Sequence, residues 1–244
     1  GPHEMKPIVK RLVDASSIPV IVNPNAGLPR EENGRTVFDV TPEDFAATMS
    51  ELSDLGIQVA GGCCGTTFEH IRQEIEALKK KPFRAPVPKH RTVVTSFSRA
   101  VEIGPRCVVI GERINPTGKK RFKQALRDQD LPYILQEGLN QEDAGADILD
   151  VNVGLPEIDE PAMMETVIKR LQGVTGLPLQ IDTTDVQALE RALRCYNGKP
   201  MINSVNGKKE NIEAVMPLVA KEMCWLVVKV VEGVVRLSGL FSLT

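Results

Sequence analysis

Short β-rich apolar runs alternate with amphipathic helical patterns along most of the chain. The apolar runs predict strands, and the longer periodic segments between them predict helices. The expected strands are Pro19–Asn23, Ile57–Gly61, Cys107–Glu112, Asp147–Val153, Pro178–Asp182 and Pro200–Val205. The expected helices are Glu4–Ala15, Pro42–Leu55, Thr67–Lys80, Leu131–Ala144, Pro161–Gln172, Val186–Cys195 and Lys209–Lys221. Alternation of this kind is typical of an α/β fold with a parallel sheet and crossover helices.

The helix expected at Pro42–Leu55 has a clear signal at each end. Thr41 can cap its first turn, and Pro42 suits the first helical position. Gly56 follows the last turn, where glycine commonly ends a helix. These signals set both bounds of this helix.

The segment 81–105 interrupts the alternation of strands and helices. It has basic residues and no helical period, and it contains Pro82, Pro86, Pro88 and Pro105. We interpret it as an interdomain linker with some extended structure around Thr92–Phe97. A complete eightfold βα barrel needs about 250 residues. The 244 residues, divided by a linker, therefore hold at most part of one barrel on each side.

The tail, residues 223–244, departs from the pattern of the preceding units. Its segment Trp225–Val235 is rich in valine and lacks the acidic and turn residues that close the earlier units. Two interpretations stay open: one more strand with a loose end, or a frameshifted or foreign end.

Composition and charge are those of a globular protein with enough apolar residues for a core. Hydrophobic residues make up 42% and charged residues 25%, and the net charge is −2. No block of like charge indicates a nucleic-acid or membrane-surface partner. The apolar runs are shorter than the ~20 residues that span a bilayer, and no signal peptide opens the chain. Five cysteines, an odd number, do not indicate a secreted disulfide framework, so we expect a reducing, cytoplasmic location.

Polar side chains gather at or just after the carboxyl ends of the predicted strands. In parallel α/β folds this edge is where ligands bind. Asparagine and aspartate also favour the start of loops, so turn chemistry remains an alternative for any one of these residues. The residues in question are Asn23, Asn25, Cys63, Cys64, Glu112, Asn115, Asp150, Asn152, Asp182, Asn203 and Ser204.

Two adjacent cysteines, Cys63 and Cys64, lie between glycines just before a predicted helix. Thiolates in that position could bind a soft metal. Zinc needs at least a third protein ligand, and neither another cysteine in this half nor the spacing of the histidines supplies one. From the residues alone, a metal site and inert cysteines both remain open.

Glu112, Asp150, Asn152 and Asp182 could line a polar pocket for a heterocycle. A carboxylate can accept two parallel N–H bonds from an amidine-like ring edge, and an amide can both donate and accept. This chemistry suits a pterin. A capping or turn-stabilising role remains the alternative for each side chain alone.

Six short motifs follow one another in a recognisable order. They are Pro24–Pro29, Gly61–Thr66, Val108–Gly118, Asp150–Gly154, Ile181–Thr183 and Ile202–Val205. In this order they resemble the cobalamin-dependent methionine synthase family, from the closing zinc motif of its homocysteine barrel into its pterin-binding barrel. The resemblance covers most of the chain and fades at the tail.

The resemblance implies parts of two (β/α)8 TIM barrels joined by a linker, each incomplete in this chain. Residues 1–80 would be the C-terminal portion of the homocysteine- and zinc-binding barrel, and 81–105 the linker. Residues 106–222 would be the N-terminal portion of the pterin (methyltetrahydrofolate)-binding barrel, and 223–244 an atypical tail. The third zinc cysteine is expected a few residues before Gly1.

The resemblance also implies roles for single residues. Cys63 and Cys64 would be two of three zinc-bound thiolates, and Asn25 matches the place of a fourth ligand that homocysteine displaces. Asn152 is the candidate catalytic residue, because it could form the hydrogen bond that develops as N5 of the folate gains a proton. The pterin would be held by Glu112, Asn115, Asp150, Asn152, Asp182 and Asn203.

The implied activity is that of a 5-methyltetrahydrofolate–homocysteine S-methyltransferase. Methyl would pass from methyltetrahydrofolate through cobalamin to the zinc-activated homocysteine thiolate, which makes methionine. Cobalamin would be bound by another domain, because no Asp-x-His-x-x-Gly motif occurs here. With half of each site, the chain is expected not to turn over alone. Two alternatives remain: a non-catalytic pterin- or metal-binding remnant, and another pterin-dependent methyltransferase, against which the cysteine pair counts.

Overall fold

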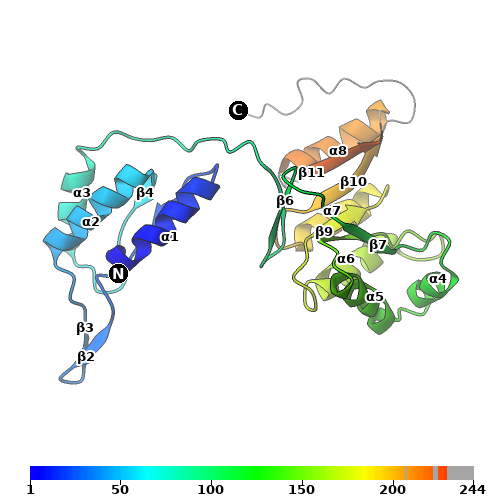
Figure 1. The fold of residues 1–244 in the computed structure, drawn as a ribbon, viewed down its shortest axis with the longest axis horizontal. Coiled ribbons are helices and arrows are strands. Elements are labelled where there is room, and N and C mark those ends of the chain that lie inside the picture. The colour runs from blue at the N-terminus through cyan, green and yellow to red at the C-terminus, as the bar shows by residue number, and fades with distance from the viewer. Residues whose placement is uncertain (207, 222–224, 230–244) are drawn as a thin grey trace. The chain divides into compact units, whose positions relative to one another are not determined.

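The computed structural model describes residues 1–206, 208–221 and 225–229. The chain divides into two compact units, Gly1–His90 and Arg91–Thr244, which are considered one at a time (Figure 1). Both units are α/β and contain parallel strands. Within the described residues, none of the helices has the length and apolar character needed to cross a membrane.

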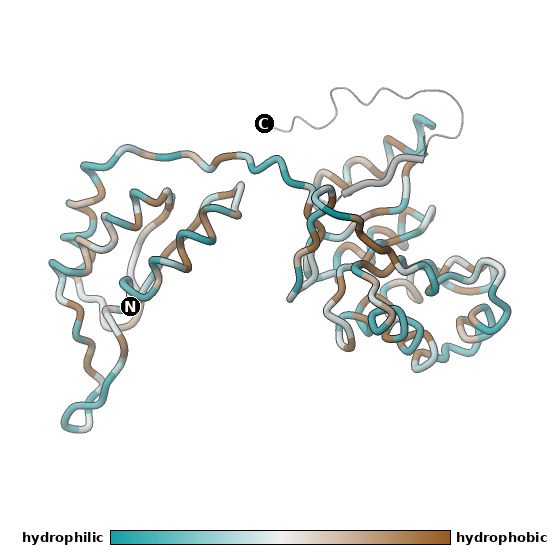
Figure 2. The backbone as a smooth tube through the Cα atoms, in the orientation of Figure 1, coloured by the Kyte–Doolittle hydropathy of each residue, from teal (hydrophilic) through white to brown (hydrophobic). Residues whose placement is uncertain are grey.

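The first unit places three helices around a short parallel strand pair. The helices are α1 (Pro2–Ala15), α2 (Pro42–Leu55) and α3 (Phe68–Leu78), and the paired strands are β1 (Ile21–Val22) and β4 (Val59–Ala60). An antiparallel hairpin, β2 (Arg30–Glu32) and β3 (Arg35–Val37), extends from the loop after β1, and its tip is hydrophilic (Figure 2). The core of this unit consists of Val9, Val20, Val22, Phe45, Met49, Leu52 and Ile57.

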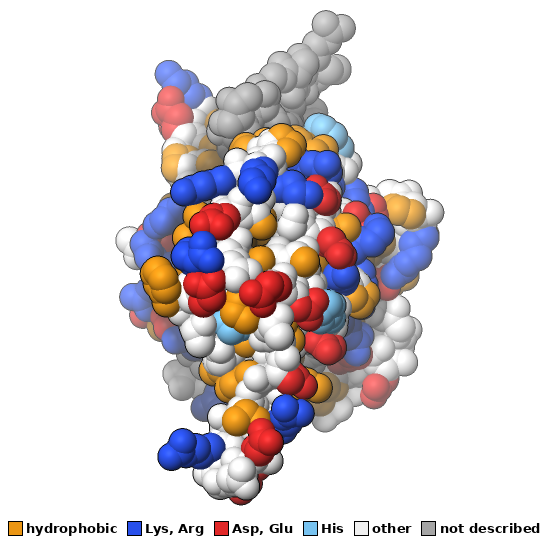
Figure 3. Space-filling view, turned by 90° about the vertical axis from the view of Figure 1, so that its left-hand side faces the viewer, with side chains coloured by type: hydrophobic (Ala, Val, Ile, Leu, Met, Phe, Trp, Pro, Cys, Tyr) orange, Lys and Arg blue, Asp and Glu red, His pale blue; other side chains and the backbone are white. Residues whose placement is uncertain are grey.

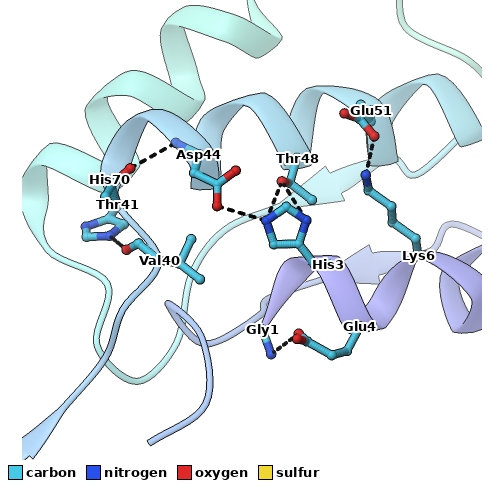
Figure 4. Close-up of polar contacts among 10 residues, drawn as sticks. All are labelled: Gly1, His3, Glu4, Lys6, Val40, Thr41, Asp44, Thr48, Glu51 and His70. Atoms are coloured by element: carbon cyan, nitrogen blue, oxygen red, sulfur yellow. Dashed lines mark hydrogen bonds and ion pairs between the residues drawn. The ribbon is translucent and has the colours of Figure 1, made fainter.

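Polar contacts join the helices of the first unit at their ends (Figure 4). The ring of His3 on α1 lies 2.9 Å from the Asp44 carboxylate on α2. The predicted bounds of α2 are confirmed: the Thr41 hydroxyl accepts the backbone N–H of Asp44 at 3.3 Å, and Gly56 ends the helix with φ 107°. His70 of α3 hydrogen-bonds the Val40 carbonyl at 2.9 Å. The start of α2 is therefore tied to both neighbouring helices. On the face drawn in Figure 3, basic and acidic side chains are interspersed.

The second unit is built on a five-stranded parallel sheet with the order β11-β10-β9-β8-β7. The strands are β7 (Ile110–Ile114), β8 (Ile148–Val151), β9 (Leu179–Asp182), β10 (Met201–Asn206) and β11 (Trp225–Lys229). The helices are α4 (Lys120–Arg127), α5 (Leu131–Asp143), α6 (Glu160–Leu171), α7 (Val186–Cys195) and α8 (Lys209–Lys221). Because the neighbouring strands are parallel, their carboxyl ends all meet at one edge.

The two faces of this sheet carry different side chains. Leu149, Val151 and Ile181 belong to the large apolar core that the helices complete. The alternate residues Ile148 and Met201 instead form a small cluster with Val94 and Val101 of a hairpin. Further along the same strands this second face becomes polar, at positions such as Asp150, Gln180 and Asp182.

The hairpin consists of β5 (Thr92–Thr95) and β6 (Ala100–Ile103), and it lies within the segment predicted as a linker. It belongs to the second unit and packs on the rest of it, where the Tyr196 hydroxyl donates to the Thr95 carbonyl at 2.8 Å and the Ser96 hydroxyl donates to the Gly176 carbonyl at 2.7 Å. Residues 82–91 carry no helix or strand. The assignment of 81–105 as an interdomain linker stays a prediction.

The predicted strands and helices occur; α2, α7 and α8 have the predicted ends, and the ends of the others are shifted. β7 begins at Ile110 rather than Cys107, because the ladder to β8 starts with the pair Ile110 and Ile148. The sequence interpretation did not include β2, β3, β6 and α4. Of the tail 223–244, the structure describes Trp225–Lys229, which pair in parallel with β10; the rest of that prediction lies outside the described residues.

Candidate functional site

Five polar residues lie together on the second face of the sheet, near its carboxyl edge. Asp150 of β8 is the register partner of Gln180 of β9, and Asp182 of β9 is the register partner of Asn203 of β10. Asn152 follows β8 directly and lies two residues beyond Asp150. Residues two apart on a strand share a face, so the five side chains form one polar layer above the apolar cluster.

Asp150 is the most buried member of this layer, with 3% of its surface exposed. Its Oδ1 atom accepts a hydrogen bond from the Gln180 side-chain amide, and the Asn203 side chain hydrogen-bonds it as well. Burial raises the pKa of Asp150 to about 6; the charges of Asp182 and Glu112 act in the same direction, and the two hydrogen bonds oppose them. This carboxyl therefore titrates close to neutral pH.

Asn152 and Asp182 form a hydrogen-bonded pair at the end of the layer nearest the carboxyl edge of the sheet. Asn152 Nδ2 donates to Asp182 Oδ2 at 3.0 Å, and Asn152 Oδ1 accepts the Gly154 backbone N–H at 2.9 Å. The asparagine is thus held from both ends, and its amide orientation is defined. The other oxygen of Asp182, the second lone pair of its Oδ2 atom and one lone pair of the Asn152 carbonyl remain for a ligand.

Both residues line a cavity of about 560 Å³. The Thr183 hydroxyl donates to the Glu160 carboxylate and accepts the Asp185 backbone N–H at 3.0 Å. The cavity is rich in hydrogen-bond acceptors, so it suits a ligand with several N–H or O–H donors. Its polar lining includes Thr117, Asn152, Asp159, Glu160, Asp182, Thr183, Thr184 and Asp185.

Two of the predicted residues have their own partners at the end of β7. The exposed Glu112 carboxylate accepts from Lys119 Nζ at 3.0 Å, and the same ammonium group donates to the Glu112 carbonyl. The buried Asn115 accepts the Thr117 backbone N–H at 2.8 Å, which is a turn contact. Glu112 lies close enough to affect Asp150 electrostatically, whereas Asn115 acts on the loop that brings Thr117 to the cavity.

The cysteine pair of the first unit lies on the loop after β4. The Cys63 and Cys64 sulfur atoms are exposed and 3.8 Å apart, and this contact between the thiols raises the pKa of Cys64. Asn25 Oδ1 accepts the Cys64 backbone N–H at 3.1 Å, so the loops after β1 and β4 are joined. Gly65 has φ 81°, and a Cβ atom there would come within 2.2 Å of the Phe38 ring, so glycine is required.

The spacing of the two sulfur atoms fits a shared zinc ion. With Zn–S distances of about 2.3 Å and tetrahedral angles, two thiolates on one zinc lie about 3.8 Å apart. The two sulfur atoms are already at this distance, 3.8 Å. Among the described residues, no group of three or more His, Cys, Asp or Glu side chains is placed to hold a metal. The chain thus supplies two adjacent thiols that suit zinc.

Several residues of the polar layer and cavity were not identified from the sequence. Gln180 lies two residues before Asp182, so the alternation of the strand could have revealed it. Glu160 and Thr183, which line the cavity, lie at a helix start and in a loop. Their position at the cavity depends on how the surrounding loops fold, and no local sequence pattern indicates that position.

The fold is that of an α/β protein, and its polar layer lies at the carboxyl ends of parallel strands, the edge where such folds commonly bind ligands. The sequence profile described as "pterin binding enzyme" matches residues 111–236, and the profile described as "homocysteine S-methyltransferase" matches residues 1–78. The first match spans more than half of the chain, so the chain belongs to the pterin binding enzyme family.

The chain is also similar to two mycobacterial methionine synthases. It is 32% identical to that of Mycobacterium leprae (strain TN) over 235 residues, which are 91% of this chain and 19% of the relative. The identity to that of Mycobacterium tuberculosis is 32% over 231 residues, with the same coverage of 91% and 19%. The chain therefore spans about a fifth of the length of these relatives. A solved dihydropteroate synthase from Vibrio fischeri shows 17% identity and a TM-score of 0.39, covering 61% of this chain and 52% of its own.

Proposed function

We propose that the chain is part of a 5-methyltetrahydrofolate–homocysteine S-methyltransferase of the cobalamin-dependent type. The observation that carries this proposal is the order of the two profile matches, homocysteine S-methyltransferase before pterin binding enzyme, in one chain. The similarity to methionine synthases runs across both matches. The cysteine pair and the absence of a disulfide pattern are consistent with a cytoplasmic enzyme.

In this proposal each unit is part of a (β/α)8 barrel. Residues 1–80 form the C-terminal portion of the homocysteine barrel, 81–105 join the two, and 106–222 form the N-terminal portion of the pterin barrel. The pterin profile match continues past residue 222, to residue 236. The polar second face of the sheet would then face the interior of the barrel, where a ligand can be enclosed.

The polar layer, which we call the pterin layer from here on, binds methyltetrahydrofolate through its hydrogen-bond acceptors. Asp182 can take two parallel N–H bonds from the amidine edge of the ring, one on each oxygen, because the bond from Asn152 uses only one of the two lone pairs of Oδ2. Glu112, Asp150 and Asn203 add acceptors nearby, and Asn115 holds the loop at Thr117. The pterin ring would lie against Asn152 and Asp182, next to the cavity of about 560 Å³.

Asn152 is the proposed catalytic residue. The amine at N5 is a poor leaving group unless it is protonated, and a carbonyl oxygen held in place can accept that new N–H. The Asn152 carbonyl is already oriented by Gly154 and has a lone pair free. A contact that forms only as the proton arrives stabilises the transition state more than the bound substrate.

Cys63 and Cys64 would hold zinc, with Asn25 beside them as a candidate further ligand. Zinc bound there would supply Lewis acidity that lowers the pKa of the homocysteine thiol. The protein's own contribution is to hold both thiols on one short loop, with Asn25 anchoring the Cys64 backbone. Cobalamin, the methyl carrier of the proposed reaction, would be bound by another domain.

Calorimetric titration of the chain with 5-methyltetrahydrofolate tests the proposal. We expect saturable one-to-one binding that weakens at least tenfold in Asp182→Asn, because a carboxylate is exchanged for an amide that cannot accept both ring N–H groups. Asp128→Asn, at an exposed aspartate at the end of α4, is the matched control. A folded chain that does not bind the folate would contradict the proposal.

A further inference from the structure

A row of three polar side chains from neighbouring strands lies in the inner part of the pterin layer. Gln180 and Asp150 are 6% and 3% exposed, and the Gln180 amide N–H donates to Asp150 Oδ1. Asn203, one strand further, hydrogen-bonds the same carboxyl group. The proposed function uses Asp150 and Asn203 but assigns nothing to Gln180.

This row determines which end of the Asn203 amide faces the ligand. An ionised carboxylate only accepts hydrogen bonds, so both amides must turn their NH₂ groups toward Asp150. The Asn203 carbonyl oxygen then points away from Asp150. It is buried and has no hydrogen-bond partner among the described residues. A buried carbonyl oxygen without a donor is unfavourable, so this position calls for an N–H group on the ligand.

Gln180 keeps this arrangement by stabilising the ionised form of Asp150. Burial and the charges of Asp182 and Glu112 favour the neutral acid, and the hydrogen bonds from Gln180 and Asn203 oppose them. Loss of Gln180 would raise the pKa of Asp150 further and so favour the neutral acid, whose O–H could donate to the Asn203 carbonyl. The Asn203 amide would then turn over and present NH₂ to the ligand.

We propose that Gln180 is a positioning residue that makes the site select reduced pterins over fully oxidised ones. This inference rests on the proposed function. A tetrahydropterin ring carries N–H at position 8, which can donate to the Asn203 oxygen. In a fully oxidised pterin the ring nitrogen is a bare acceptor, whose lone pair would face that oxygen. The Gln180–Asp150 contact thus sets a preference for a donor on the ligand.

The test measures two dissociation constants, for 5-methyltetrahydrofolate and for folic acid, by calorimetry on the full chain. We expect the unaltered chain to prefer the reduced ligand by at least tenfold. In Gln180→Met, which keeps the size but removes the donor, that ratio should fall about tenfold. Gln180→Glu, which adds a second carboxyl beside Asp150, should lower the ratio in the same way and provides the measurement if the methionine variant does not fold.

Gln172→Met is the matched control. The Gln172 side chain makes three hydrogen bonds at the end of α6, with Ile168, Cys195 and Asn197, so its loss should lower stability without changing the ratio. Equal weakening of both ligands in a folded Gln180 variant, or an unchanged ratio, would overturn the selectivity role. Failure of the unaltered chain to bind either ligand would instead overturn the proposed function, and this inference with it.

Discussion

At the scale of single residues, the site is notable for how many of its polar groups already have partners inside the protein. Asn152 is held by Asp182 and by the Gly154 backbone, and Asp150 is held by Gln180. Asn152 and Asp182, which line the cavity, keep oriented lone pairs for a ligand. Binding therefore needs little reordering of side chains, and side-chain ordering is a recurrent cost of association.

Asn152→Ala separates binding from chemistry, provided the protein contains both barrels complete. If the Asn152 carbonyl accepts the new N5 proton, the variant should lose about a hundredfold in the methyl-transfer rate from the folate. The affinity for the folate should fall less, by about tenfold, because Asp182 loses one supporting hydrogen bond. Rapid-mixing kinetics and calorimetry measure the two quantities. Equal losses in rate and affinity would assign Asn152 to binding alone.

Cys63→Ser tests the thiol pair in a protein that contains the complete homocysteine barrel. A serine hydroxyl is a poor zinc ligand at neutral pH, so zinc retained after dialysis should drop to background, as measured by metal analysis. Binding of 5-methyltetrahydrofolate should not change, because the pterin layer lies in the other compact unit. Cys107→Ser, at an exposed cysteine of the second unit, is the control and should leave zinc retention unaltered. Loss of folate binding in Cys63→Ser would point to misfolding rather than to a lost ligand.

At the scale of elements, the helices that were predicted from sequence have ends marked by local chemistry. Thr41 and Gly56 bound α2 because a side-chain cap and a left-handed residue act within a few residues of the helix. The hairpin of β2 and β3 was missed although its two-residue turn, Asn33-Gly34, is a strong local signal with both residues at positive φ. The flanking strands Arg30–Glu32 and Arg35–Val37 are largely charged and exposed, so they show no apolar alternation. The charged helix α4 was missed for the same reason, although its buried residues Phe122, Ala125 and Leu126 lie on one face.

The candidate site, like the helices and strands, was predictable only where a local sequence pattern marks it. Asp150, Asn152 and Asp182 follow from the rule that strand carboxyl ends carry ligands, and the structure brings them together. Pairings between strands far apart in sequence could not be foreseen. Gln180 meets Asp150 only because β8 and β9 pair in that register. The contact between Glu112 and Lys119 likewise depends on a turn whose path the sequence pattern does not define.

The buried carboxyl of Glu74 makes α3 sensitive to pH. Glu74 is 2% exposed, its Oε1 atom has no hydrogen-bond partner among the described residues, and burial raises its pKa to about 6. Since the folded-state pKa lies above the unfolded value of 4.5, the folded chain binds the proton more tightly. The stabilisation is complete below the unfolded value and is lost as pH rises through about 6.

Glu74→Gln should therefore raise the free energy of unfolding by about 1–2 kcal/mol at pH 7 and change it little at pH 4. Urea unfolding at both pH values measures this. Asp150 titrates in the same range, so the difference between variant and unaltered chain isolates the contribution of Glu74. The control is Glu76→Gln on the same helix, where the exposed carboxylate pairs with Arg72. A Glu74 variant that is less stable at pH 7 would show that the carboxylate has a stabilising partner.

At the scale of the whole molecule, the two compact units have separate apolar cores. Phe45 and Met49 belong to the core of the first unit, and Leu149 and Ile181 to that of the second. The proposed ligands divide in the same way, with zinc at the cysteine pair of the first unit and the folate at the polar layer of the second. Each ligand should therefore stabilise the unit that binds it and leave the other unchanged.

Scanning calorimetry of a protein that contains both barrels complete should show two unfolding transitions that respond to different ligands. A ligand at a hundred times its dissociation constant stabilises the folded form by about 2.7 kcal/mol, which corresponds to several degrees for a unit of this size. Zinc should shift one transition and 5-methyltetrahydrofolate the other. Cys63→Ser should abolish only the zinc shift, and Asp182→Asn only the folate shift. A single transition that both ligands move together would mean that the two units unfold as one, and that the site in each is energetically coupled to the other.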